Sequence, residues 1–142
     1  MRSPGVHHTG ITVSDLDRSI EFYGRLGFEP DEELIEEGEE VERGVGVPGA
    51  KLRSAILLGP NESRLELIQY LEPAGAPPAH PNNGIGAAHI CLEVEDVDAA
   101  VAELREHGVQ FLTDPITHEA GIRWVYAKDP DGVTAELLQV LE

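Results

Sequence analysis

The sequence feature that most constrains the fold is an internal repeat. Residues 65–72 read LELIQYLE, and residues 135–142 read AELLQVLE, seventy positions later. Residues 8–16 read HTGITVSDL, and they return as HICLEVEDV at residues 89–97, eighty-one positions later. Such repetition indicates that one supersecondary unit occurs twice in the chain. We therefore expect two similar modules within the 142 residues.

The patterns of apolar residues predict the same elements in both modules. Each module begins with a strand in which apolar and polar residues alternate. A helix follows, with an aspartate able to cap its first turn and a glycine able to end it. Two or three antiparallel strands complete the module, so that two modules side by side would form a curved sheet with helices on its outer side. The predicted strands are residues 6–13, 52–58 and 65–71, then 87–94, 111–113, 122–127 and 134–141; the predicted helices lie between Asp15 and Gly27 and between Asp96 and Gly108.

The chain is predicted to be a single domain, residues 1–142, made of modules at about 5–72 and 86–142. Residues 73–85 are rich in proline, alanine, glycine and asparagine, a composition typical of a linker. The first module is the longer one, because it contains an insertion with many glutamates between Glu32 and Glu42. We expect this insertion to be a solvated surface loop or a lid, or to supply a second catalytic base.

Composition excludes several classes of protein. One cysteine cannot form an intramolecular disulfide, which agrees with a reducing, cytoplasmic setting. No apolar run approaches the roughly 18 residues of a membrane span, and no signal peptide is evident. A net charge of -17 disfavours nucleic acid and anionic membranes, which bind basic surfaces. We therefore expect a cytoplasmic protein with a small-molecule partner, no nucleic acid and no membrane.

The strand period places four candidate metal ligands on matching faces. Side chains alternate between the two faces of a strand, so His8 and its repeat equivalent His89 lie opposite the apolar residues that the helices cover. Glu66 and Glu136 likewise lie opposite their apolar neighbours, although a glutamate in an apolar strand is costly unless it is compensated. Two imidazoles and two carboxylates suit one divalent cation, and this set accepts Zn, Ni, Co, Mn or Fe. The alternative is that the histidines are hydrogen-bonded interior residues and the glutamates are ordinary surface charges.

Three segments resemble the vicinal oxygen chelate superfamily, which includes glyoxalase I, methylmalonyl-CoA epimerase, extradiol dioxygenases and bleomycin resistance proteins. They are residues 8–23 (HTGITVSDLDRSIEFY), 88–97 (AHICLEVEDV) and 129–137 (DPDGVTAEL). The resemblance implies an α+β fold of two tandem βαβββ modules, whose mostly antiparallel, U-shaped sheet encloses a metal. It also implies ligands from the first and last strand of each module, which are His8, Glu66, His89 and Glu136.

The resemblance further implies an enzyme in which a metal stabilises an enolate and a carboxylate moves a proton next to a carbonyl. Glu136 is the first candidate for this base and Glu66 the second. The main hypothesis is an epimerase of an acyl-CoA resembling methylmalonyl-CoA, although that enzyme typically carries glutamine where Glu66 stands. Alternatives are a glyoxalase I-type lactoylglutathione lyase, an Fe(II) extradiol dioxygenase and a non-catalytic antibiotic-binding or resistance protein. Family members often pair modules between chains, so we expect a homodimer.

Other residues are weaker candidates for a substrate pocket. Cys91 shares the face of His89, although a lone cysteine in a strand is often a small buried hydrophobe. Two arginines at equivalent positions, Arg53 and Arg123, would hold a substrate carboxylate or phosphate, or else pair with the protein's own carboxylates. Trp124 and Tyr126 share one face, which is either pocket wall or core. The histidines without a repeat partner, predicted to lie at the surface, are His80, His107 and His118.

Overall fold

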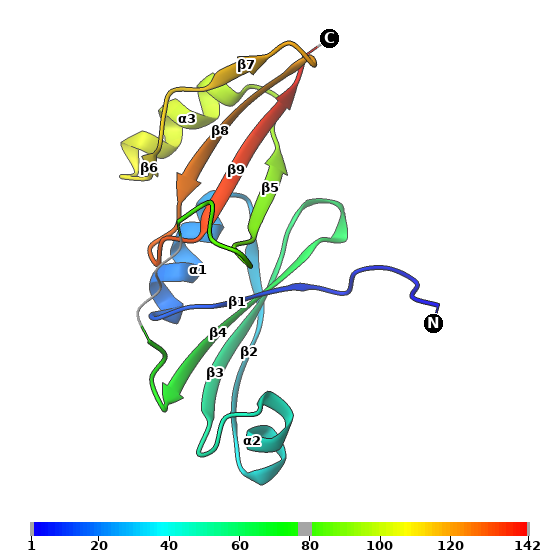
Figure 1. Ribbon diagram of the computed structural model, residues 1–142, viewed down its shortest axis with the longest axis vertical. Coiled ribbons are helices and arrows are strands. Elements are labelled where there is room, and N and C mark those ends of the chain that lie inside the picture. The colour runs from blue at the N-terminus through cyan, green and yellow to red at the C-terminus, as the bar shows by residue number, and fades with distance from the viewer. Residues whose placement is uncertain (1, 77–80, 142) are drawn as a thin grey trace. The chain divides into compact units, whose positions relative to one another are not determined.

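The computed structural model describes residues 2–76 and 81–141, and the chain divides into two compact units, residues 1–77 and 78–142. Each unit has its own mixed sheet of mostly antiparallel strands with a helix packed on it (Figure 1). The predicted α+β fold class is therefore confirmed. Four residues of the predicted linker, 77–80, lie outside the described residues, and so does His80.

In the first unit the sheet order is β1-β4-β3-β2, and β1 runs parallel to β4 while the other neighbours are antiparallel. The first strand and the last strand of the unit are thus direct neighbours. The elements are β1 (Thr9–Thr12), α1 (Leu16–Arg25), β2 (Glu29–Glu37), α2 (Glu39–Val45), β3 (Lys51–Leu58), a short 3-10 helix (Pro60–Glu62) and β4 (Arg64–Glu72).

The second unit repeats this topology, with the order β5-β9-β8-β6 and a short strand β7 that also pairs with β8. Again the first and last long strands, β5 and β9, are parallel neighbours, while β8 and β9 are antiparallel. The elements are β5 (His89–Glu93), α3 (Val97–Glu106), β6 (Gln110–Phe111), β7 (Ile116–His118), β8 (Ile122–Lys128) and β9 (Thr134–Val140).

Both main helices start and stop as the sequence predicts. Asp15 caps α1 by accepting a hydrogen bond from the backbone N–H of Arg18 at 3.0 Å, and Asp96 caps α3 by accepting from Ala99 at 2.9 Å. Gly27 and Gly108 follow the helices with φ of 92° and 81°, the left-handed conformation that glycine adopts without strain. The repeat therefore extends to the caps.

Each helix covers one face of its own sheet, which decides which side chains are left on the other face. In the first unit the covered face buries apolar residues of β3 and β4 against α1, with Leu57, Leu65 and Leu67 fully buried. In the second unit Val125 and Ala135 are fully buried in the same way. Full burial of a leucine or valine side chain stabilises the fold by roughly 1.5–3 kcal/mol. A one-residue slip of β4 or β9 would lose this burial, so the register is strongly specified.

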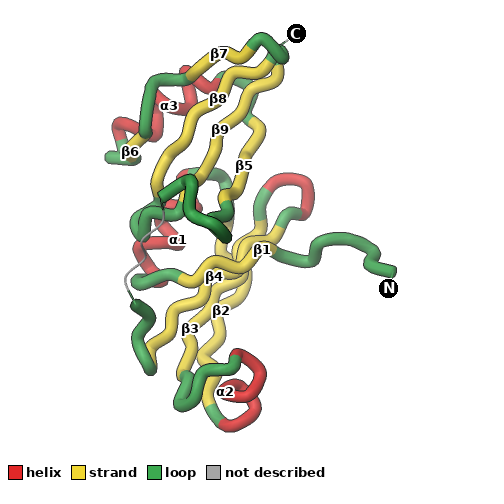
Figure 2. The backbone as a smooth tube through the Cα atoms, viewed as in Figure 1, coloured by secondary structure: helices red, strands yellow, loops and turns green. Residues whose placement is uncertain are grey.

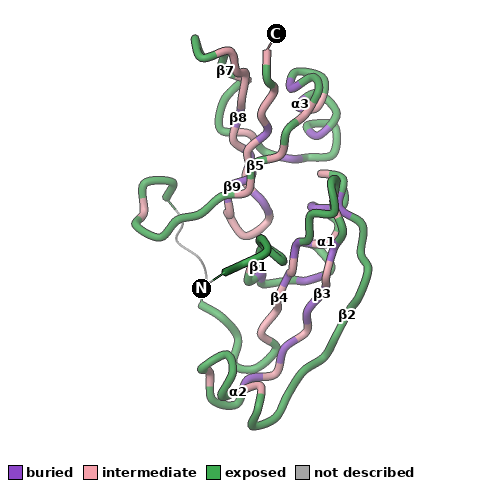
Figure 3. Tube along the Cα trace, turned by 90° about the vertical axis from the view of Figure 1, so that its right-hand side faces the viewer, coloured by how far each residue is buried: buried purple, intermediate pink, exposed green. Residues whose placement is uncertain are grey.

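The glutamate-rich insertion is not the loop that was expected. Its first part is β2, and its second part is the short helix α2 (Figure 2). Its predicted exposure is confirmed, since every side chain of β2 is exposed (Figure 3). The prediction of a loop was wrong because β2 pairs antiparallel with β3 along Glu29–Glu37, so that backbone hydrogen bonds order a segment with no buried side chain.

No helix in the described part of the chain is long and apolar enough to cross a membrane.

Candidate functional site

In the first unit, His8 and Glu66 meet on the face that the helix leaves uncovered. His8 directly precedes β1, and the parallel pairing of β1 with β4 places Gly10 beside Glu66. The His8 Nε2 atom lies 3.1 Å from the Glu66 Oε2 atom, with the two side chains 39% and 25% exposed. Next to them, the Nδ1 atom of His7 lies 2.9 Å from that of His8, and the Nη1 atom of Arg64 lies 3.3 Å from the Nε2 atom of His7.

In the second unit, His89 and Glu136 form the equivalent pair. His89 is the first residue of β5, and Glu136 lies in β9, with Cys91 as its register partner in β5. The His89 Nε2 atom lies 3.0 Å from the Glu136 Oε2 atom, with the side chains 43% and 13% exposed. His8 and His89 are therefore not the interior residues that the alternative predicted, because both side chains are exposed to solvent.

The chemistry of these two pairs fits a divalent cation. In each pair an imidazole Nε2 and a carboxylate oxygen, the atoms that coordinate metals, approach one another on an accessible face. Within residues 2–76 and 81–141, no group of three or more histidine, cysteine, aspartate or glutamate side chains is gathered in a geometry able to hold a metal ion.

The surroundings of the two carboxylates differ. Tyr126 is the β8 register partner of Glu136, whereas Ile56 holds that place beside Glu66. The Tyr126 ring lies 5.4 Å from the His89 ring and 5.0 Å from the Trp124 ring, measured between centroids. Trp124 and Tyr126 are half-buried and lie on the face of Glu136. Burial, followed by the charge of Glu136, raises the pKa of the Tyr126 phenol.

Cys91 also contacts this carboxylate. The alternative prediction of a small buried hydrophobe is wrong, because Cys91 is exposed. Even so, partial burial of the sulfur, together with the charge and hydrogen bonding of Glu136, raises the pKa of the Cys91 thiol to about 11. Cys91 is therefore a protonated hydrogen-bond donor at neutral pH. The repeat-equivalent position in the first unit is Gly10, where an added Cβ would lie 3.8 Å from Glu66 Oε2.

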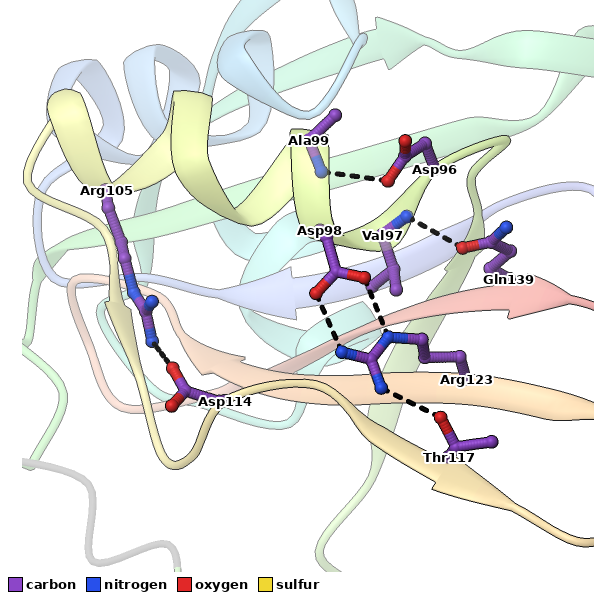
Figure 4. Close-up of polar contacts among 9 residues, drawn as sticks. All are labelled: Asp96, Val97, Asp98, Ala99, Arg105, Asp114, Thr117, Arg123 and Gln139. Atoms are coloured by element: carbon purple, nitrogen blue, oxygen red, sulfur yellow. Dashed lines mark hydrogen bonds and ion pairs between the residues drawn. The ribbon is translucent and has the colours of Figure 1, made fainter.

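The two arginines lie on the opposite, helix-covered faces, so they do not belong with these residues. In the second unit, the Arg123 guanidinium donates two hydrogen bonds of 2.8 Å to Asp98 at the start of α3 and one to Thr117 (Figure 4). In the first unit, Arg53 binds Asp17 in the same way and adds Glu33. Both arginines thus pair with the protein's own carboxylates, as the alternative predicted, and their role as substrate contacts stays a prediction.

The arginines also shift the titration of their partners. Hydrogen bonding and charge from Arg53 hold the pKa of Asp17 below its ordinary value. Arg123 does the same for the pKa of Asp98 through its hydrogen bonds and then its charge. Both interactions fasten a helix to a strand on the face away from the candidate ligands.

A polar cluster that the sequence did not predict lies on the face of Glu136. The Lys128 Nζ atom donates to Asn82 Oδ1 and to Thr134 Oγ1, both at 2.7 Å, and the Thr134 hydroxyl donates to Asn82 at 2.7 Å. Lys128 ends β8, and its position two residues after Tyr126 would have predicted that it shares the face of that residue. Asn82, in the segment before β5, carries no such pattern in the sequence.

Known proteins are similar to this chain over most of its length, across both units. The family model described as Glyoxalase/Bleomycin resistance protein/Dioxygenase superfamily matches residues 5–137. The chain is 38% identical to a 2-epi-5-epi-valiolone epimerase from Actinomyces sp, covering 95% of this chain and 79% of that protein. It is 28% identical to the mitochondrial methylmalonyl-CoA epimerase of Homo sapiens, covering 94% and 73%, and 29% identical to a probable lactoylglutathione lyase of Synechocystis, covering 93% and 92%. Among solved structures, a glyoxalase family protein from Bacillus cereus has a TM-score of 0.91 at 26% identity, covering 100% of this chain and 97% of that one.

Proposed function

The chain belongs to the Glyoxalase/Bleomycin resistance protein/Dioxygenase superfamily, and we propose that it is a divalent-metal-dependent epimerase acting on a carbon next to a carbonyl group. The observation that carries this proposal is the presence of the same His–Glu pair at repeat-equivalent positions of both units. Relatives named as epimerases, at 38% and 28% identity, support the reaction class.

His8, Glu66, His89 and Glu136 would hold the metal ion. Such an ion, when bound, polarises a carbonyl oxygen and so acidifies the neighbouring C–H bond. The identity of the metal stays open among Zn, Ni, Co, Mn and Fe, because nitrogen and oxygen ligands accept all of them.

Glu136 is the first candidate for the base that removes the proton. It is 13% exposed against 25% for Glu66, so water competes less for its carboxylate oxygens. Cys91 and Tyr126 are its register partners in β5 and β8, and the Cys91 thiol forms a hydrogen bond with its carboxylate. Glu66 is the second candidate, and in an epimerisation it would return a proton to the other face of the carbon. This is general acid–base chemistry by two positioned carboxylates.

Metal content tests the ligand set. The purified protein is expected to retain about one equivalent of a divalent metal per chain by mass spectrometry, as one four-ligand site requires. The His8→Ala, His89→Ala double variant should lose that metal, whereas His107→Ala, an exposed histidine outside both pairs, should keep it. A double variant with full metal content would exclude these ligands, and iron in the wild type would favour the dioxygenase alternative.

Exchange of the substrate's α-hydrogen in deuterated water tests the reaction. The two compounds named in the epimerase relatives, 2-epi-5-epi-valiolone and methylmalonyl-CoA, are the substrates to assay first. The metal-loaded protein should catalyse exchange with one of them, and Glu136→Gln should reduce the rate by about 100-fold or more, the usual contribution of a general base. Glu36→Gln on the exposed strand β2 is the matched control. Absence of exchange with both compounds would count against the epimerase.

A lactoylglutathione lyase is the second candidate, favoured by the Synechocystis relative at 29% identity. Its reaction, like that of an epimerase, includes a proton transfer next to a carbonyl group, so the same carboxylates would act in it. The assay is formation of the thioester from the adduct of methylglyoxal and glutathione. Product formation without exchange of either epimerase substrate would select this function. A homodimer remains a prediction that light scattering tests directly.

A further inference from the structure

Lys128 is a cation on the face of the His89–Glu136 pair. Strand register places His89, Thr134 and Lys128 in one row across β5, β9 and β8. The next row on the same face holds Glu136 and Tyr126. Rows two residues apart are separated by about 7 Å along a strand. The ammonium group of a long side chain in this row is therefore within reach of a ligand bound beside Glu136.

Lys128 differs in its partners from the cations of the protein that form ion pairs. In a chain with a net charge of -17, ion pairs with a carboxylate are formed by Arg25, Lys51, Arg53, Arg105 and Arg123. Within the described residues, Lys128 has only two neutral oxygen partners, those of Asn82 and Thr134. The adjacent Asp129 is buried and accepts hydrogen bonds from the backbone of the following turn. The positive charge of Lys128 is thus held in place without a carboxylate partner in the part of the chain that the structure describes.

The geometry leaves one donor for a ligand. An ammonium group has three N–H donors, and two of them are used by Asn82 and Thr134. These two acceptors also restrict the flexible side chain, which reduces the entropy lost when the third donor binds a ligand.

The first unit indicates that this lysine is not needed for the module to fold. At the repeat-equivalent place in β3 stands Leu58, and its register partner Arg64 stands where Thr134 does in the second unit. The same strand pairing therefore forms without the Lys128 cluster. A residue that the fold does not need, on the face of the candidate site, points to a role in binding.

We propose that Lys128 is a specificity-determining residue that binds a carboxylate of the substrate beside His89 and Glu136. The substrate class is a carbonyl compound that also carries a carboxylate group, and this assignment rests on the function proposed above. A charge-assisted hydrogen bond from a positioned ammonium is stronger than a neutral one, so it discriminates between a carboxylate and an uncharged group of the same shape.

The test compares acetoacetate with acetoacetamide, two probes of nearly equal shape that differ in charge. Binding of each to the purified protein, with the metal that it retains, is measured by calorimetry or by NMR titration. In the wild type acetoacetate should bind more tightly. In Lys128→Leu, which copies the residue of the first unit, the ratio of the two affinities should fall by roughly tenfold or more.

Matched variants separate binding from a structural role. Asn82→Ala and Thr134→Val each remove one partner but keep the ammonium, so they should retain most of the preference, and Lys128→Arg should retain it as well. An equal loss for both probes in Lys128→Leu, an unchanged ratio, or no measurable binding of acetoacetate to the wild type would overturn the proposal.

The outcome is separable from that of the proposed function. A preference for acetoacetate that depends on Lys128, without α-hydrogen exchange of any carbonyl substrate, would contradict the epimerase and leave the anion-binding role standing. Exchange of the α-hydrogen together with an affinity ratio that does not depend on Lys128 would support the epimerase and contradict the anion-binding role of Lys128.

Discussion

Two glutamines at equivalent places in the repeat provide the sharpest test of how each module is held together. The side-chain oxygen of Gln139 accepts a hydrogen bond of 3.1 Å from the backbone N–H of Val97, at the start of α3 (Figure 4). Gln69 accepts the same bond from Leu16, at 2.9 Å, in the first unit. The first N–H groups of a helix have no partner within the helix, so each glutamine fastens a helix start to the last strand.

Replacing Gln139 by alanine should destabilise the protein by about 1–2 kcal/mol. Val97 is fully buried, so its N–H group would gain little compensation from water, and an unsatisfied buried donor costs about 1–3 kcal/mol. For a chain of this length that loss lowers the melting temperature by about 3–6 °C. Gln69→Ala should cause a similar loss of stability. Because the two glutamines lie in different units, the losses in the double variant should add. Calorimetry measures the melting temperature, and urea unfolding measures the free energy of unfolding.

Substitution by glutamate distinguishes this mechanism from simple loss of packing. Gln139→Glu keeps an acceptor oxygen and adds a negative charge, which is favourable near a helix N-terminus. It should therefore keep wild-type stability at neutral pH, and Gln110→Ala, at an exposed position, serves as the neutral control. The reasoning would be refuted if Gln139→Glu lost as much stability as Gln139→Ala, or if Gln139→Ala behaved like the control.

Three further predictions concern pH, packing and metal. Because Arg123 lowers the pKa of Asp98, the folded state binds this proton more weakly than the unfolded state, so the pair stabilises the fold above the unfolded pKa and this contribution is lost as pH falls. The difference in unfolding free energy between the wild type and Arg123→Met should therefore shrink between about pH 5 and pH 2. Leu67→Ala removes a fully buried side chain of β4 and should cost about 2–5 kcal/mol in urea unfolding, whereas Leu71→Ala, which is exposed, should cost less than about 1 kcal/mol. Removal of bound metal by a chelator should lower the melting temperature of the wild type but not that of the double histidine variant, since a ligand stabilises only a protein that binds it.

Much of the local structure follows from the sequence because it depends on neighbouring residues. Asp15 and Asp96 cap helices as predicted, since a cap needs only a side-chain oxygen at the right position relative to the first turn. The placement of Glu66 and Glu136 opposite the apolar core follows from strand alternation alone. The exception is β2, whose many glutamates do not form a strand pattern in the sequence. Its order comes from pairing with β3, since none of its side chains is buried.

What only the tertiary structure decided is the set of partners across strands. Alternation says which face a residue occupies but not which residue stands opposite it, because register depends on how the core of the whole unit packs. Only the fold places Tyr126 and Cys91 beside Glu136, turns Arg123 toward the helix, and brings Asn82 to Lys128. By itself, the sequence determined a duplicated module with a histidine and a glutamate in each copy, since a repeat is a property of the chain. The chemistry around each glutamate came from contacts between segments far apart in the sequence, which form only when the strands are packed.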